Sequence, residues 1–149
     1  MYHHFTGKAE LARAAIERSG AELRAAAEEQ LGGDGTATDR ITHYLERDRD
    51  VLKGCRIGRL TADPDVMGDP ELRAPVAETF GWLRTRLAEI VAEGKRRGEY
   101  PDRLDPEQTA ATIAAVLQGG YVLARAAGSP EPFELAVQGL INLFPEATK

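Results

Sequence analysis

Residues 105–127 read DPEQTAATIAAVLQGGYVLARAA, and this stretch decides the fold class. It opens with an aspartate, a proline and a glutamate. Proline at the first helical position loses no hydrogen bond, and an acidic residue beside it suits the positive end of a helix. The residues that follow are apolar on nearly every side of that helix. Because such a helix must be covered on all its faces, we expect one side to pack on its own domain and the opposite side to meet a partner.

Two other stretches open in the same way, Asp69-Pro70-Glu71 and Ser129-Pro130-Glu131. Together with the start at Asp105 they predict a long helix over about 70–97, the apolar helix over 106–127, and a last helix that ends near residue 144. Asp105 with Gln108 also resembles a capping box, in which two side chains satisfy the first free backbone donors of a helix.

The first half of the chain also has helical spacing. Thr6 is a capping residue for a helix over about 8–30, and a second helix is expected from about Thr38, with an apolar side formed by Ile41, Tyr44, Leu45 and Leu52. A short kinked segment, 55–60, follows and closes at Asp63-Pro64-Asp65. No run of alternating apolar residues indicates a sheet, so the sequence predicts an all-α fold of about six helices.

The charge balance bears on nucleic-acid binding. The chain has 149 residues and a formal net charge of −5, from 19 basic and 24 acidic residues. Affinity for duplex DNA is dominated by the phosphates that a protein neutralises, and a DNA reader usually carries a basic patch. The densest basic cluster, Lys95-Arg96-Arg97, falls at a predicted helix end, where cations are favoured. We therefore expect this chain alone not to bind DNA.

The sequence also predicts where the protein works. We find no stretch near the roughly 18 continuous apolar residues of a membrane span, and no apolar signal-peptide core in the His-rich N-terminal residues. The single cysteine, Cys55, forms no internal disulfide, which fits a reducing compartment. We expect a cytoplasmic protein of one domain, with no membrane partner.

Patterns that indicate catalysis are missing from the sequence. It has no paired Glu-x-x-His motif, no P-loop and no Gly-x-Ser-x-Gly elbow. Of its three histidines, His3 and His4 are neighbours that would point in different directions on a helix. We expect no enzyme activity, no cofactor and no metal site.

The last helix repeats the excess of apolar surface. Phe133, Ala136, Val137, Leu140, Ile141 and Phe144 form one stripe, and Leu135 and Leu143 lie off it. Two such helices in succession predict a homodimer through a four-helix interface, two helices from each chain. The residues that we assign to this interface are Leu117, Gly120, Tyr121, Ala124, Val137, Leu140, Ile141 and Phe144. The alternative is that both helices are central in a monomer core.

The N-terminal residues, Met1-Tyr2-His3-His4-Phe5-Thr6-Gly7-Lys8-Ala9-Glu10-Leu11, carry a family resemblance. They resemble the point in TetR-family transcriptional regulators where the DNA-recognition helix ends and the next helix begins. The segment 54–60, Asp69-Pro70-Glu71-Leu72 and the Leu117-Gln118-Gly119-Gly120 helix are similar to a subgroup with an LmrA/YxaF-type C-terminal domain. That subgroup has an apolar residue or proline at position 56 and asparagine at position 59, and both are arginine here.

The resemblance implies a TetR-like C-terminal helical bundle with a remnant of the recognition helix. Residues 1–7 are then what is left of the helix-turn-helix domain, and residues 8–149 are the sensing and dimerisation domain. It implies phosphate contacts for Tyr2, His3 and Lys8. The expected function is that of a ligand-responsive repressor whose complete form binds operator DNA and an unknown small-molecule effector. The alternative is a dimerisation or ligand-binding module that does not bind DNA.

The resemblance also implies a ligand pocket inside the bundle. From the helices that wall such pockets we select Tyr44, Cys55, Leu60, Phe80, Leu83 and Gln118 as candidate ligand contacts. Gln118 stands out because an amide in an apolar helix needs a hydrogen-bond partner. The alternative for each of the six is a plain core position. Cys55 raises the further alternative of a redox sensor, which requires an exposed thiol with a lowered pKa.

Overall fold

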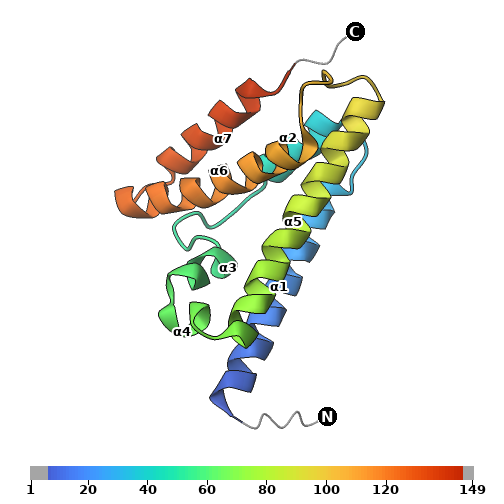
Figure 1. Cartoon of the computed structure of the whole chain (residues 1–149). Helices are drawn as coiled ribbons and strands as arrows, with labels where there is room; N and C mark the ends of the chain where they lie inside the picture. The colour runs from blue at the N-terminus through green and yellow to red at the C-terminus, as the bar shows by residue number, and fades with distance from the viewer. Residues whose placement is uncertain (1–6, 146–149) are drawn as a thin grey trace.

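The computed structural model describes residues 7–145, and within that range every regular element is helical. The elements are α1 (Lys8–Leu31), α2 (Ala37–Glu46), α3 (Arg56–Arg59), the 3-10 helix η1 (Leu60–Ala62), α4 (Pro64–Met67), α5 (Pro70–Arg96), α6 (Pro106–Ala127) and α7 (Glu131–Leu143). The all-α prediction is confirmed. The long helices α1 and α5 run side by side, and α6 and α7 lie across their upper half (Figure 1).

The α1–α5 pair is the axis of the molecule, and its two helices run parallel. Gly20 of α1 lies against Thr79 of α5 so closely that a Cβ at residue 20 would overlap the Thr79 hydroxyl oxygen. Two turns further on, Arg86 holds Glu28 with two hydrogen bonds of 2.8 Å. This bidentate pair lowers the pKa of Glu28 mainly through the hydrogen bond from Arg86. Glycine at residue 20 lowers the stability of an isolated helix, but the close packing of α1 on α5 requires a residue without a side chain there.

The helix starts follow from the caps. The side chains of Asp69 and Asp105 accept backbone hydrogen bonds at the starts of α5 and α6, as the sequence predicts. At α7 the capping position is Pro130 and not Ser129, although the Ser129 hydroxyl accepts a 3.3 Å bond from the Glu131 N–H. Asp63, predicted to close a segment, instead caps α4.

Two expectations for the first helices need correction. α1 begins after Gly7, which has no capping side chain, and Thr6 lies outside the described residues. α2 ends at Glu46, so Leu52 is not on it and is 46% exposed. A full capping box between Thr36 and Asp39 starts α2 at Ala37, one residue before the predicted start.

Arginines fix the ends of α1 and α2. Buried Arg40 donates from Nε to the carbonyl oxygen of Leu31 at 2.7 Å and pairs with Glu93 of α5 at 3.2 Å. Arg49 donates to the carbonyl oxygens of Leu45 and Tyr44 at 2.7 and 2.6 Å. The free carbonyls at both helix ends are thereby satisfied by side chains from elsewhere in the chain.

The core has two parts. The main cluster lies where α6 and α7 pack on α1, α2 and α5, and its fully buried side chains include Leu31, Ile41, Leu87, Ile90 and Ile113. A second, smaller cluster joins α1 to α3, α4 and α5 through Ile16, Ile57, Val66, Leu72 and Val76. Cys55 packs against both clusters, so the chain around residue 55 is the link between them.

Helix α6 is long and apolar enough, by length and composition alone, to cross a membrane. Its most apolar window has a mean hydropathy of 1.2, and 33% of that window is buried inside the protein. A core helix of a soluble protein passes the same test.

Replacing Gly20 by alanine tests the α1–α5 contact. The added Cβ must push α1 away from Thr79, and such overpacking typically costs about 1–3 kcal/mol of unfolding free energy. The matched control is Gly81→Ala in α5, where a Cβ meets nothing within 4 Å and the helix gains up to about 1 kcal/mol. Urea unfolding at equal protein concentration measures both, and equal stability of the two variants would contradict the packing described here.

Candidate functional site

A cleft of about 660 Å³ opens between the α3–η1 segment and one side of α6. Its walls come from the loop before α3, from α3, η1, α5 and α6. The lining residues are Gly54, Cys55, Gly58, Arg59, Thr61, Ala62, Phe80, Gln118, Gly119, Tyr121, Val122 and Arg125. Small-molecule sites are typically clefts of about 300–1,000 Å³ with apolar walls and a few polar groups. The size and the lining of this cleft fit that description.

The cleft is built around a close approach of Gln118 to Gly58. The side-chain oxygen of Gln118 occupies the place that a Cβ at residue 58 would take, so only glycine lets α6 approach α3 here. The N–H of Gly58 also donates to the sulfur of Cys55 at 3.4 Å, which caps α3. The position of α3 therefore depends on two residues that line the cleft.

The two charged residues of the cleft are arginines, and their side chains converge on Gly54. A Cβ on Gly54 would lie 3.4 Å from Cδ of Arg125 and 3.6 Å from Cδ of Arg59. Arg59 donates to the carbonyl oxygen of Lys53 at 3.2 Å. Across residues 7–145 neither guanidinium pairs with a carboxylate, unlike Arg13, Arg18, Arg40, Arg86 and Arg97. This corner of the cleft thus carries positive charge without a counter-charge.

Tyr121 connects the cleft wall to a buried aromatic cluster. Its ring centroid lies 4.7 Å from that of Phe133, and the guanidinium carbon of Arg49 lies 5.1 Å from the Tyr44 ring centroid and 5.7 Å from that of Phe133. Burial raises the pKa of both Tyr44 and Tyr121, and the positive charge of Arg49 opposes that rise. Burial also lowers the pKa of Arg49. A positive charge therefore lies behind the cleft wall.

The six candidate ligand contacts divide into two sets. The structure brings Cys55, Phe80 and Gln118 together on the cleft wall. Tyr44 and Leu83 are buried in the main core cluster, and Leu60 packs against the second cluster. Ligand contact remains a prediction for the first set, and the second set occupies positions that the core explains.

Sequence reasoning missed Arg125, Tyr121 and Arg59 as cleft residues. Arg125 and Tyr121 follow Gln118 at seven and three residues, so helical spacing alone puts all three on one side of α6. Arg59 differs from the subgroup pattern, and the structure places that difference on the cleft wall. The convergence of Arg59 and Arg125 depends on contacts between distant segments and has no local signal.

The eight residues assigned to a dimer interface are turned largely toward the protomer's own core. Leu117, Gly120, Tyr121, Ala124, Val137 and Leu140 are buried, and Ile141 and Phe144 are partly buried. Gly120 lies against Phe133, since a Cβ there would be 2.9 Å from its ring. Most of these side chains are thus packed within the protomer, and their assignment to a dimer interface stays a prediction.

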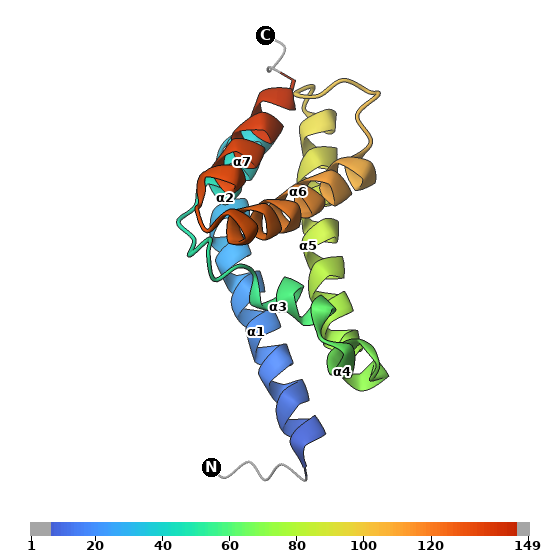
Figure 2. The ribbon, with the colours of Figure 1, turned by 90° about the vertical axis from the view of Figure 1, so that its left-hand side faces the viewer.

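The opposite side of the same two helices is apolar and bare. Val122, Leu123, Leu135 and Leu143 are 66, 57, 64 and 80% exposed. We call the surface formed by Ala115, Gly119, Val122, Leu123, Ala126, Leu135, Gly139 and Leu143 the open face. In Figure 2, α6 and α7 lie nearest the viewer with no element over them. Exposed apolar side chains gathered on two neighbouring helices favour an interaction site.

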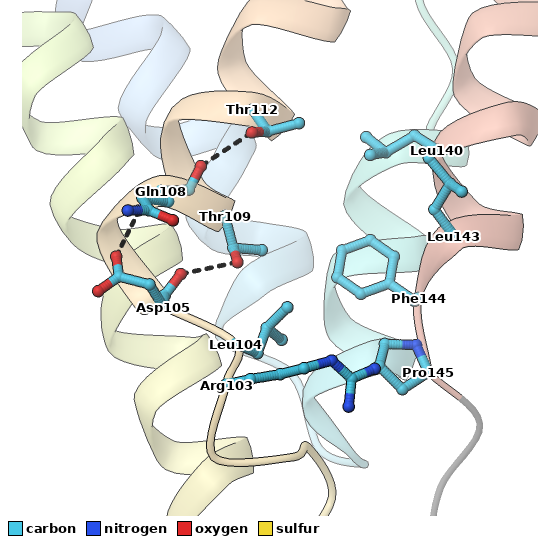
Figure 3. Close-up of a pocket in the computed structure, with 10 residues that line it drawn as sticks. All are labelled: Arg103, Leu104, Asp105, Gln108, Thr109, Thr112, Leu140, Leu143, Phe144 and Pro145. Atoms are coloured by element: carbon cyan, nitrogen blue, oxygen red, sulfur yellow. Dashed lines mark hydrogen bonds between the residues drawn. The ribbon is translucent and has the colours of Figure 1, made fainter.

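A smaller hollow of about 280 Å³ lies between the start of α6 and the end of α7 (Figure 3). Leu140, Leu143 and Phe144 face Leu104 and Thr112 across it, while the hydroxyls of Thr109 and Thr112 donate back to their own helix start. Leu143 also belongs to the open face. The hollow is smaller than most ligand sites, so we regard the larger cleft as the better candidate.

The predicted phosphate contacts lie at the start of the chain. Tyr2 and His3 are outside the described residues. Lys8 is the exposed first residue of α1, at the far end of the molecule from α6 and α7. Within the part of the chain that the structure describes, no group of three or more His, Cys, Asp or Glu side chains is arranged to hold a metal.

The buried phenols make a prediction about pH. Because folding raises the pKa of Tyr44, the unfolded chain loses this proton first as pH rises above about 10, and the unfolding free energy falls. We expect wild-type protein to lose more stability between pH 9 and pH 11 than Tyr44→Phe, measured by urea unfolding. Tyr100 and Tyr121 titrate in both proteins, so their contributions to the loss of stability cancel in the comparison. Equal losses in the two proteins would show that Tyr44 has no raised pKa.

Known proteins share this architecture. The structure of a TetR transcriptional regulator from Chloroflexus aurantiacus superposes with a TM-score of 0.84 at 28% identity, covering 95% of this chain and 74% of that protein. The regulatory protein TetR from Rhodobacter sphaeroides gives 0.82 at 22% identity, covering 97% of this chain and 79% of its own. A TetR-family regulator from Cytophaga hutchinsonii superposes with a TM-score of 0.85 at 20% identity, covering 97% of this chain and 76% of that protein. The last two show the fold alone.

Sequence comparison adds the family. No curated protein matches the chain. A family model described as the tetracyclin repressor-like C-terminal domain matches residues 35–140, which is more than half of the chain and includes the cleft and most of the open face. The chain therefore belongs to the TetR family of transcriptional regulators.

Proposed function

We propose that residues 8–149 form the effector-sensing and dimerisation domain of a ligand-responsive TetR-family repressor. Regulators of this family act as dimers that bind operator DNA and small-molecule effectors. The observation that carries the proposal is that one helix, α6, contributes both to a cleft and to an exposed apolar surface. Gln118, Tyr121 and Arg125 line the cleft, while Val122 and Leu123 belong to the open face.

The dimer forms when the open face of one chain covers that of a second copy. A two-fold contact between identical faces gives a bundle of four helices, α6 and α7 from each chain. Gly119 and Gly139 favour a close approach of the second copy, because glycine has no side chain to hold two helices apart and both residues are exposed. The interface of this proposal uses the exposed sides of the helices that the sequence selected, and not the stripes buried in the core.

The cleft and the open face share Gly119 and Val122. A small molecule in the cleft therefore touches the wall against which the partner packs. It also touches Gly58 and Arg59 of α3, whose neighbour Ile57 packs with Ile16 of α1 in the second core cluster. An effector that binds two arrangements of α3 unequally shifts the population between them and moves the first half of α1.

In this proposal, the contacts of the chain with DNA come from its first eight residues. In this proposal Tyr2, His3 and Lys8 contact the DNA backbone, and motion of α1 changes the spacing of the two DNA-reading heads in the dimer. The separation of half-sites is a geometric constraint, so a small shift weakens operator binding. The acidic balance of the chain supports placing sequence recognition outside residues 8–149. The protein is not an enzyme in this proposal and works in the cytoplasm without a cofactor.

Sedimentation equilibrium tests the dimer. We expect wild-type protein at micromolar concentration to have twice the chain mass of 16.2 kDa. The double substitution Leu135→Arg and Leu143→Arg places charge in the open face and should yield monomers, because unpaired charges are excluded from such a contact. Leu52→Arg, at an exposed leucine of the loop after α2, is the control and should remain dimeric.

A wild-type monomer would overturn the dimerisation role. A dimer that survives the double substitution but dissociates in Leu52→Arg would place the interface elsewhere.

A further inference from the structure

We infer that the cleft selects an effector with an apolar body and an anionic head group, a carboxylate or a phosphate, and that Arg59 and Arg125 bind this head. The inference rests on the proposed sensing function of the cleft. It goes further by naming the chemical class of the ligand.

The first argument is the arrangement of charge at Gly54. The side chains of Arg59 and Arg125 come from different helices, and the stems of both pass within 3.6 Å of the position of a Cβ on Gly54. Two positively charged side chains on the same rim of a cleft both attract an anion that binds there. Guanidinium groups present planar donors that match carboxylate and phosphate oxygens.

The second argument is that no protein group already fills this role. The cleft lining contains no aspartate and no glutamate. Arg125 makes no hydrogen bond or ion pair within residues 7–145, and Arg59 bonds only a backbone carbonyl. Arg40 and Arg86, which reach across to other helices, are paired with glutamates. The guanidinium groups of Arg59 and Arg125 have no such partner and are available to an anion in the cleft.

The third argument is the rest of the wall. Phe80, Ala62 and Val122 give it apolar surface, and the Gln118 amide and the Thr61 hydroxyl are the neutral polar groups near it. The Thr61 hydroxyl already donates to the carbonyl oxygen of Gly58 at 2.6 Å. The positive charge of Arg49 behind Tyr121 adds to the field of the two arginines. A cationic ligand would meet this positive field with no acid to hold it.

Calorimetric titration of the full chain tests the inference with probes that share a body and differ in the head. Naphthoate and octanoate are the acids, naphthyl phosphate is the second anion, and naphthamide and octanamide are the neutral isosteres. We expect at least one anion to bind about tenfold or more tightly than its amide, a difference of about 1.4 kcal/mol. That preference should shrink at high salt, since screening weakens an ion contact and leaves the amide unaffected.

Variants locate the effect. Arg59→Gln combined with Arg125→Gln should remove the preference for the anion and leave amide binding unchanged. Arg73→Gln is the matched control, an exposed arginine of α5 outside the cleft, and should behave as wild type. Both arginines of the cleft are exposed, so the double variant should unfold at the wild-type temperature.

The outcomes separate this inference from the proposed function. Amides that bind as tightly as the anions, or a preference that survives the double variant, would overturn the anionic effector and leave the cleft as a ligand site. Failure of every probe to bind more tightly than about 1 mM would overturn both the anionic effector and the assignment of the cleft as the sensing site.

Discussion

The structure depends on one constraint, which is that α6 is apolar on two opposite sides. Its inner side, with Ile113, Leu117 and Ala124, completes the core against α5 and α7. Its outer side, with Val122 and Leu123, has no cover within the described chain. Because a helix that is apolar on both sides needs cover on both, the second copy that we propose would cover this outer side. The cleft overlaps both sides, since Tyr121 is also buried and Gly119 and Val122 also belong to the open face, so one helix contributes to the core, the open face and the cleft.

The parallel pair of α1 and α5 connects the cleft to the start of α1 through side-chain packing. α1 passes from the main core to Lys8 with Gly20 held against Thr79 and Glu28 held by Arg86. Below that contact, α1 is joined to α3 through Ile16 and Ile57. Because α3 also forms one wall of the cleft, this packing is the route by which we propose that an effector acts on the first turns of α1. Packed helices shift between discrete arrangements and do not deform continuously, which suits a two-state switch.

The sequence predicted the structure best at helix starts, where a single capping side chain determines the backbone. Aspartate and proline at residues 69–70 and 105–106 placed the starts of α5 and α6, because caps act within one turn. It was least informative about the rotation of α6, since a helix that is apolar all round has no periodicity to say which side faces its own domain. The regular stripe through Leu117 and Ala124 therefore suggested an interface, and in the structure these two residues are buried in the protomer's main core cluster. The contact of Gln118 with Gly58, and the convergence of Arg59 and Arg125, join segments about 60 residues apart and have no local signature.

Hydroxyl-radical footprinting of leucines in the intact protein tests the central claim most directly, because the chain supplies its own references. Leu11 and Leu52, at 54 and 46% exposure, lie outside α6 and α7. Leu123, Leu135 and Leu143 are more exposed in the single chain, at 57, 64 and 80%. If the open face is covered by a second copy, these three leucines will label more slowly than Leu11 and Leu52. Labelling that instead follows the exposures of the single chain, fastest at Leu143, would contradict the account.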